Sequence, residues 1–326
     1  MNQKFLDFMH GFRNQPIAVA VSGGVDSVAL LHWLVEIGAD VRALHVNHGL
    51  RPSAGVESEY VQNLCRGLNV PCHVFHWGDA KPTAGLEAAA RTARYSMMTD
   101  WCRANGIKYL AVAHQADDQI ETFLLNLARG SGLSGLAAMR PKTLRDGVWI
   151  LRPLLAVPRG DLQEYCDRRK IKYFHDEMND DMHYARVRMR KMRHVLRDCL
   201  GISDSRILLA VNNLGRCRDA LESDVGGAVR AVCQDRRAEF SDSFLFDLSP
   251  EIRLKFLGTL IMQIGGGEYQ PRLKSLEGAL HNLSQDCKFT LGHCTVRRLG
   301  NRILIVPEGA RASFRKKHER HKKESK

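Results

Sequence analysis

A glycine-rich segment near the start of the chain has the residue types needed to bind a phosphate. The apolar residues 18–21 lead into Ser22-Gly23-Gly24-Val25-Asp26-Ser27, and helical spacing of apolar residues follows. Glycines let a backbone approach a ligand closely, and a helix that begins beside them offers N–H groups and the positive end of its dipole. Ser22 and Ser27 can add hydroxyl donors, and Asp26 can hold a magnesium ion on a pyrophosphate. The alternative is a tight strand-to-helix turn without a ligand.

Two other nucleotide-binding patterns do not apply to this chain. No Gly-Lys-Ser/Thr follows the glycines, so the segment is not a Walker P-loop. Residues 130–135 match the dinucleotide pattern G-x-G-x-x-G, but they follow a predicted helix and not a strand. The phosphate site is therefore predicted at residues 22–27, which we call the glycine-rich loop.

Acidic residues follow another apolar stretch, residues 109–113. His114 comes directly after this stretch, and Asp117, Asp118 and Glu121 come within the next seven positions. Residues three or four apart lie on the same face of a helix, so these carboxylates are expected side by side. They could bind a cationic substrate or simply complement the helix dipole.

Basic residues form two groups that could bind phosphates. Arg91 and Arg94 are three apart on one predicted helix and could clamp a phosphate with their planar guanidiniums. Residues 186–197 contain six basic residues and no acid, so a helix formed by them would follow a nucleic-acid backbone, remote from the acidic residues. Each group could instead be a solvated helix face. The residues predicted to bind nucleic-acid phosphates are Arg186, Arg188, Arg190 and Arg193.

His45 and His48 have the spacing of a metal-binding pair at the end of a predicted strand. A strand end gives poor geometry for such a pair, and the sequence offers no third ligand such as a cysteine pair. We therefore expect His45 to line an adenine pocket at the tip of that strand rather than to bind zinc.

Alternating strands and helices are predicted to position these groups. Four short apolar or β-branched runs suit the strands of a parallel sheet that is buried on both faces. The predicted strands are 17–21, 41–46, 73–77 and 109–113, and the helices between and after them are 27–37, 57–68, 86–105 and 119–128. This alternation indicates a doubly wound α/β fold, in which ligands bind at the carboxyl ends of the strands.

The character of the chain changes in its second half. Helical segments at 216–238, 251–264 and 271–285 precede a two-strand pattern at 289–298 and 303–307, with a turn at Leu299-Gly300-Asn301. We therefore predict an α/β domain over residues 1–203, a smaller α+β domain over 204–310, and a mobile basic tail over 311–326 with a net charge of +6.

Composition excludes several classes of protein. The chain has 326 residues, of which 44% are hydrophobic and 26% charged. These values are typical of a globular protein and not of a disordered chain, a collagen or a coiled-coil rod. The 48 Lys and Arg residues against 36 Asp and Glu give a net charge of +12, which favours a polyanionic partner such as nucleic acid.

Cysteine usage and the N-terminus predict a reducing, cytoplasmic environment. The nine cysteines are scattered and form no Cys-x-x-Cys pair, which argues against a zinc knuckle or a dithiol redox motif. Residues 1–13 lack the apolar run of a signal peptide, and the longest apolar stretch, 28–39, is interrupted by His32 and Glu36. No membrane association is expected.

Several motifs, taken in order, resemble those of one enzyme family. The glycine-rich loop is similar to that of the PP-loop ATP-pyrophosphatases. The further motifs lie at residues 45–51, 87–95, 114–122, 129–132 and 151–154. As an ordered set over residues 17–190, they resemble the tRNA(Ile)-lysidine synthetases, and the predicted hairpin at 289–308 is similar to a later domain of that family.

The resemblance implies an activity and its substrates, with residues 1–203 as the PP-loop ATP-binding catalytic domain and residues 204–310 as a tRNA-recognition domain. ATP would adenylate the C2 oxygen of the wobble cytidine (position 34) in the isoleucine tRNA with a CAU anticodon, and free L-lysine would then displace AMP to give lysidine. By the same resemblance, Asp26, Asp118 and Glu121 are the catalytic residues, with Mg²⁺ on Asp26 and lysine held by Asp118 and Glu121. ATP is assigned to residues 22–27, His45, Arg94 and His114, and tRNA to Arg186, Arg188, Arg190 and Arg193.

The chain departs from the family pattern in two places. Val187 stands where the pattern has asparagine, and Met178 follows the acidic pair where the pattern has Ser-Asn. Asp176 and Asn179 keep their places, as do the arginines at 186, 188 and 190. The tRNA or active-site contacts that the missing polar residues make in the family therefore remain open for this chain.

Three other functions are compatible with parts of the sequence. A PP-loop enzyme that inserts sulfur into tRNA generally needs a catalytic cysteine or a cysteine-held cluster, and no cysteine lies within the motifs above. A glutamine-dependent amide synthetase would need a glutaminase domain, which the sequence does not show. An RNA-binding protein with a vestigial nucleotide fold would not need intact catalytic residues, namely Ser22, Asp26, Asp118 and Glu121. The sequence also leaves open whether the chain forms a homodimer.

Overall fold

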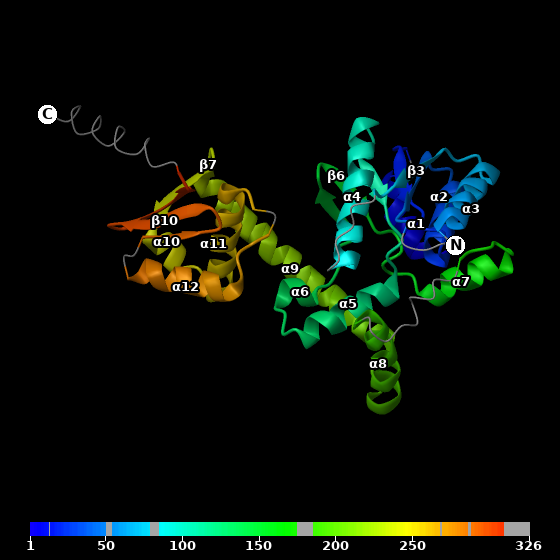
Figure 1. The fold of residues 1–326 in the computed structure, drawn as a ribbon. Helices are drawn as coiled ribbons and strands as arrows, with labels where there is room; N and C mark the ends of the chain where they lie inside the picture. Colours follow the sequence, from blue (N-terminus) through cyan, green and yellow to red (C-terminus); the bar gives the residue numbers. More distant parts are fainter. Residues whose placement is uncertain are drawn as a thin grey trace. The chain divides into compact units, whose positions relative to one another are not determined.

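The computed structural model describes residues 1–12, 14–49, 54–78, 85–174, 185–267, 269–285 and 288–309. Contacts within the chain divide it into two compact units, Met1–Gly215 and Arg216–Lys326, whose elements are labelled in Figure 1. Each unit has its own sheet and its own hydrophobic core. The predicted tail at 311–326 lies outside the described residues. Within the described ranges, no helix combines the length and the apolar character needed to span a bilayer.

A six-stranded sheet forms the centre of the first unit, with strand order β3-β2-β1-β4-β6-β5. Its strands are β1 (Ile17–Ala20), β2 (Val41–Asn47), β3 (Cys72–His76), β4 (Tyr109–Ala111), β5 (Lys142–Arg145) and β6 (Val148–Leu151). Neighbouring strands run parallel except β5 and β6, which form an antiparallel hairpin at the edge. The structure confirms the α/β class, and it adds β5 and β6 to the four predicted strands.

Helices pack on both faces of this sheet, because alternate residues of a strand point to opposite sides. Ile17 and Val19 of β1 join one core cluster, whereas Ala18 joins another together with Tyr95 and Met98. The helices of this unit are α1 (Gln3–Met9), α2 (Val25–Glu36), α3 (Ala54–Gly67), α4 (Leu86–Ala104), α5 (Ala116–Ala128), α6 (Leu133–Leu136), α7 (Arg159–Arg168) and α8 (Ala185–Leu200), with a 3-10 turn, η1 (His10–Phe12), after α1. The pairing of α2 with α7 brings two distant segments to the loop end of β1.

The first turns of α9 (Asp204–Val232) belong to the first unit. Ile207 and Val211 on this helix pack with Ile120 of α5 in a small separate core, and Met189 of α8 packs against the same core. The division between the units falls at Gly215, beyond the predicted boundary at residue 203. The physical reason is that apolar burial continues into the helix that follows that boundary.

The second unit is the smaller α+β fold that the sequence predicts. Its antiparallel sheet has the strand order β7-β8-β11-β10-β9. The elements are β7 (Cys233–Gln234), β8 (Arg237–Ser241), α10 (Asp242–Phe246), α11 (Pro250–Gly265), α12 (Leu273–Ser284), β9 (Phe289–Leu291), β10 (Cys294–Leu299) and β11 (Arg302–Pro307). Phe256 and Leu260 of α11 share a core with Val296 and Ile305 of the sheet.

Two segments of the second unit differ from the prediction. The helix predicted over 216–238 ends at Val232, and the chain continues as the β7–β8 hairpin. The single strand predicted over 289–298 is broken by a turn at Gly292 and His293, which both have positive φ. Glycine is required at 292 because a Cβ there would lie 2.6 Å from the Ile261 side chain.

Candidate active site at the carboxyl edge of the parallel sheet

The glycine-rich loop closes between β1 and α2 through hydrogen bonds among its own residues. The Ser27 hydroxyl donates to the Gly24 carbonyl at 2.9 Å and accepts from the Ser22 N–H at 3.1 Å. Gly23 has a φ of +94°, in the region that favours glycine. Gly24 is the N-cap of α2 and gives no side-chain cap, so the first turn of this helix is suited to bind an anion.

Phe174, which lies after α7 in the sequence, binds the same loop through its backbone. Its N–H donates to the Gly23 carbonyl at 2.9 Å, and Gly24 and Phe174 form an isolated parallel bridge. Tyr60 of α3 packs edge-on against the Phe174 ring, with the ring centroids 5.1 Å apart. These contacts fix the direction of the peptide between Gly23 and Gly24, which carries one of the N–H groups of the loop.

Asp26 lies on the first turn of α2 in a largely buried position. Burial raises the pKa of its carboxyl to about 7; Arg159 opposes this shift, whereas Asp118 and Asp117 add to it. Its Oδ1 accepts no hydrogen bond within the described part of the chain, and the Arg159 Nε lies 4.0 Å away. A buried carboxylate in such surroundings favours a nearby cation, because the cation offsets both the burial and the neighbouring negative charge.

Asp118 and Glu121, the two carboxylates assigned to lysine, have different surroundings on α5. Asp118 accepts from the Gln115 N–H at 3.0 Å and forms a capping box with the Gln115 side chain. Glu121 is 1% exposed, and its Oε1 lies 3.1 Å from Nε of Arg190. One carboxylate is therefore engaged by the helix cap and the other by an arginine from α8.

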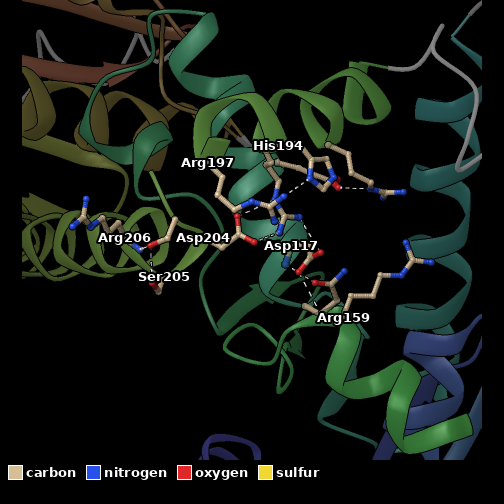
Figure 2. A network of polar contacts seen from close by, with 12 residues as sticks. Asp117, Arg159, His194, Arg197, Asp204, Ser205 and Arg206 are labelled. Carbon is tan, nitrogen blue, oxygen red and sulfur yellow. Dashed lines mark hydrogen bonds and ion pairs between the residues drawn. The ribbon is translucent and has the colours of Figure 1, made fainter. Parts of the chain in front are cut away.

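Asp117 is the centre of a polar network that joins α5, α7 and α8 (Figure 2). Its Oδ2 lies 2.9 Å from Nη1 of Arg193, and its Oδ1 accepts from the Arg159 N–H at 3.4 Å. Arg193 also donates to Asp204 at the start of α9, with its Nε 3.2 Å from Oδ1. Burial disfavours the charge on Arg193, but its hydrogen bonds to Asp204 and Asp117 outweigh that effect and raise the pKa of the guanidinium.

The expectation that the basic helix lies remote from the acidic residues is wrong for two of its arginines. Arg190 contacts Glu121, and Arg193, which is 12% exposed, contacts Asp117. The reason is that residues three apart share a helix face, and this face of α8 packs against α5. Arg188 is exposed, and the side chain of Arg186 lies outside the described residues.

His45 is buried, with 3% of its surface exposed, and both of its ring nitrogens have partners. Its Nδ1 lies 2.8 Å from the Val21 carbonyl, and its Nε2 lies 3.0 Å from the Ser58 hydroxyl. Burial lowers the pKa of the ring, so neutral His45 links β1, β2 and α3. Direct contact between a ring nitrogen and adenine would require one of these hydrogen bonds to break.

Arg94 and His114 have other surroundings again. Arg91, Arg94 and Arg145 place their guanidiniums 5.2, 5.9 and 4.6 Å from the centroid of the Tyr95 ring. His114 is half-buried between β4 and α5, directly before the cap of the acidic helix. The structure therefore gathers the loop, Asp26 and the acidic residues of α5 at one edge, and it places the Arg94 guanidinium with two other arginines around the Tyr95 ring.

Two residues at this edge are absent from the sequence prediction, namely Arg159 and Phe174. Arg159 is the first residue of α7, after an N-cap proline, and Phe174 lies beyond the end of the same helix. Neither belongs to a motif whose spacing carries chemistry. The only sequence signal for Arg159 is its place shortly after the motif at 151–154, because the packing of α7 against α2 becomes visible only in the folded chain.

Known proteins provide an independent test of this site. The sequence profile of the PP-loop domain matches residues 1–196. The tRNA(Ile)-lysidine synthase of Wolbachia sp. subsp. Brugia malayi is 35% identical over 94% of this chain and 74% of its own length. That of Ruegeria pomeroyi is 35% identical over 92% of this chain and 76% of its own length. The chain belongs to the tRNA(Ile)-lysidine synthase family.

Membership of this lysidine synthase family confirms the resemblance that the ordered motifs indicate. Among solved structures, the U34-tRNA thiolase of Methanococcus maripaludis with its [4Fe-4S] cluster has a TM-score of 0.57. It is 17% identical, and the match covers 66% of this chain and 78% of the thiolase chain. At that identity the likeness is one of fold alone.

Proposed function

We propose that this member of the lysidine synthase family joins free L-lysine to C2 of the wobble cytidine in an isoleucine tRNA with a CAU anticodon. The reaction uses ATP and releases AMP and pyrophosphate. The observation that carries the proposal is the meeting of the glycine-rich loop with the carboxylates of α5: the Arg159 Nε lies 4.0 Å from Oδ1 of Asp26, and the Arg159 N–H donates to Oδ1 of Asp117 at 3.4 Å. Substrate identity rests on the curated relatives, which are 30–35% identical.

In the first step, ATP would bind with its pyrophosphate on the glycine-rich loop. The C2 oxygen of the cytidine attacks the α-phosphorus, the bond between the α- and β-phosphates breaks, and pyrophosphate leaves. Loop N–H groups and the start of α2 favour the negative charge on this leaving group. His114, at the same sheet edge, is assigned to the nucleotide, together with Arg94 and His45. For His45, direct contact with adenine would require one of its two ring hydrogen bonds to break.

A magnesium ion fits Asp26. The side chain is 27% exposed, but its Oδ1 atom is buried and accepts no hydrogen bond among the described residues, and its pKa is raised to about 7. Magnesium commonly binds through one or two carboxylates plus substrate phosphates, and it would offset the charge of the pyrophosphate. Asp26 is accordingly the protein ligand that we assign to it.

In the second step, the ε-amine of lysine would attack C2 and displace AMP, with the loss of a proton from the amine. Asp118 and Glu121 are assigned to hold the ammonium before it loses that proton. Because Glu121 is paired with Arg190 at 3.1 Å, lysine must either displace this guanidinium or share the carboxylate with it. Asp118 already accepts the capping hydrogen bond from the Gln115 N–H at 3.0 Å, so it would hold the ammonium while capping α5.

The anticodon stem must cross the loop edge for the cytidine to reach this site. We assign tRNA phosphate contacts to Arg186 and Arg188, while Arg190 and Arg193 bind tRNA only if they leave their present carboxylate partners. The second unit and the basic tail are proposed to extend the tRNA-binding surface. The proposed location of the enzyme is the cytoplasm, where its tRNA and lysine substrates occur.

The test is a reconstituted reaction. The protein is incubated with ATP, Mg²⁺, labelled lysine and a transcript of the CAU-anticodon isoleucine tRNA, and the tRNA is then digested to nucleosides. Lysidine at the wobble position, with equal amounts of AMP and pyrophosphate, is the expected result. A transcript with uridine at the wobble position is the matched control and should retain no label. A product containing sulfur, or no labelled nucleoside, would reject the proposal.

A further inference from the structure

Arg159 reaches the glycine-rich loop from an element that contributes no other residue to the proposed site. It is the first residue of α7, after the N-cap Pro158. Its backbone N–H donates to Oδ1 of Asp117 at 3.4 Å, while its side-chain Nε lies 4.0 Å from Oδ1 of Asp26. Figure 2 shows Arg159 beside Asp117 in the network. The backbone of Arg159 is therefore tied to α5, while its side chain extends toward α2.

The guanidinium of Arg159 is held less tightly than those of its neighbours. Arg190 lies 3.1 Å from Glu121, and Arg193 lies 2.9 Å from Asp117, which are hydrogen-bond distances. The 4.0 Å contact of Arg159 with its carboxylate is longer than a hydrogen bond, and 26% of the side chain is exposed. An arginine in this state has N–H groups that can turn toward an incoming anion.

The negative charges around the loop create a need for a positively charged side chain where a polyphosphate would bind. Asp26 lies near Asp117 and Asp118, so the position that a polyphosphate must approach already carries negative charge. The N-terminus of a helix supplies only a partial positive charge. A guanidinium binds phosphate oxygens in a planar, two-pronged geometry and stays charged at any working pH. We propose that Arg159 binds the pyrophosphate part of ATP, turning from Asp26 to phosphate oxygens when the nucleotide binds.

This inference rests on the proposed function, because it requires ATP to be split between its α- and β-phosphates at the glycine-rich loop. As that bond breaks, the electron pair goes to the pyrophosphate, whose negative charge rises. A guanidinium on the β- or γ-phosphate stabilises the charge where it develops. Arg159 is thus a catalytic residue in this step, and Asp117, which holds its backbone, is a positioning residue.

A phosphate of the tRNA backbone could satisfy the same guanidinium, so the experiment must distinguish the two sources. The position of Arg159 favours ATP, since its side chain extends to Asp26, directly beside the glycines of the loop. An ATP phosphate contact should affect ATP binding and pyrophosphate release. A tRNA contact should instead affect tRNA affinity and its dependence on salt.

The experiment compares Arg159→Gln, Arg159→Lys and Arg168→Gln in the full-length protein. Arg168 is the matched control because it lies on the same helix, is 71% exposed and pairs at 3.6 Å with Glu164. Pyrophosphate release is measured with ATP, Mg²⁺ and tRNA but without lysine, and binding of ATP and of tRNA is measured separately. Arg159→Gln should release pyrophosphate about 100-fold more slowly, the typical loss for one stabilising donor. Arg159→Lys should lose about tenfold, and Arg168→Gln should stay within about twofold.

Three results would overturn the inference or separate it from the proposed function. Pyrophosphate release by Arg159→Gln at the rate of the control would show that Arg159 does not act on ATP. Weaker tRNA binding with a smaller salt slope, at unchanged ATP affinity, would assign Arg159 to the RNA backbone. If Arg159→Gln has a lower melting temperature than the wild type, pyrophosphate release by Arg159→Lys is the deciding measurement, because lysine keeps the positive charge and the backbone hydrogen bond. If the wild-type protein itself releases no pyrophosphate, the proposed function fails, whatever Arg159 does.

Discussion

The glycine-rich loop and the acidic residues of α5 lie at the same sheet edge but are stabilised in different ways. In the loop, Ser22, Gly24 and Ser27 bond to one another, with partners three to five residues apart. Around α5, Arg190 reaches Glu121 from 69 residues away. The loop thus depends mainly on local backbone geometry, whereas the acidic region depends on the docking of α8.

This difference indicates what each region tolerates. The loop forms when β1, its turn and α2 form, and the Phe174 N–H adds one distant hydrogen bond. The acidic region needs α8 and the start of α9 to pack on Ile120 and Leu124. Substitutions of the α8 arginines that contact α5 should therefore change the lysine side of the reaction and the stability of the fold, while the main effect of substitutions in the loop should be on the ATP side.

The largest effect is expected from Asp26→Asn, which tests the loop. Asparagine keeps the size of the side chain but removes the charge that would hold Mg²⁺ on the pyrophosphate, so pyrophosphate release should fall by about 100- to 1000-fold. The circular dichroism spectrum should not change. Asp40→Asn is the control, because Asp40 is exposed and lies away from the loop at the start of β2. A normal rate for Asp26→Asn would remove Asp26 from the mechanism.

Glu121→Gln should have the next largest effect, on lysine rather than ATP. The change removes one negative charge from the proposed ammonium site, so the KM for lysine should rise about 30-fold, equivalent to about 2 kcal/mol. The KM for ATP should change by less than about twofold. Because the single variant also leaves Arg190 without this carboxylate, the double variant with Arg190→Gln separates charge loss from misfolding. Equal losses for lysine and ATP in both variants would indicate a general disruption of α5.

On α8, Arg193→Gln and Arg188→Gln should separate stability from tRNA binding. Arg193 is 12% exposed and bridges Asp117 and Asp204, so its loss should lower the free energy of unfolding by about 2 kcal/mol in urea titrations. Arg188 is exposed, and its loss should leave stability unchanged but reduce the salt slope of tRNA binding by about 0.7–0.9. If both variants weaken tRNA binding alike and neither lowers stability, the whole basic helix acts as a phosphate-binding face.

The loop and the central strands could be predicted because they depend on short patterns. Glycines after a buried strand specify a turn into a helix, and in the structure Ser22 lies between β1 and α2, while Asp26 and Ser27 lie in the first turn of α2. The edge strand β5 was not predicted because its sequence, Lys-Thr-Leu-Arg, has one apolar residue and no apolar run, and its hairpin partner β6 was missed with it. Basic residues on α8 could be counted from the sequence, but not assigned to a face.

The contacts of Arg190 and Arg193 could not be predicted for a physical reason. Which face of α8 turns inward is decided by packing against Ile120, Ile207 and Val211, and two of these residues lie beyond the predicted domain boundary. Arg159 was missed because a single arginine at a helix start has no pattern. Only the approach of α7 to α2 gives it a partner.

The smallest predicted effect concerns pH and again contrasts the loop with the rest of the fold. Burial raises the pKa of Asp26 from 3.8 to about 7, with Arg159 and Arg190 opposing the shift and Asp118 and Asp117 adding to it. An unfolded chain loses this proton at lower pH than the folded one, so the contribution of Asp26 to stability is complete below 3.8 and is lost as the pH rises through about 7. Without ATP, Asp26→Asn should therefore melt about 2–4 °C above the wild type at pH 8, which corresponds to about 1 kcal/mol. This difference in melting temperature should shrink toward zero as the pH falls to about 4. Thermal melts across this range, with the exposed Asp40→Asn as the control, test the prediction. A difference in melting temperature that stays constant at every pH would mean that the substitution acts through packing and not through the charge of Asp26. Addition of Mg²⁺ and ATP should close this difference at pH 8, because the ligands should stabilise only the wild type.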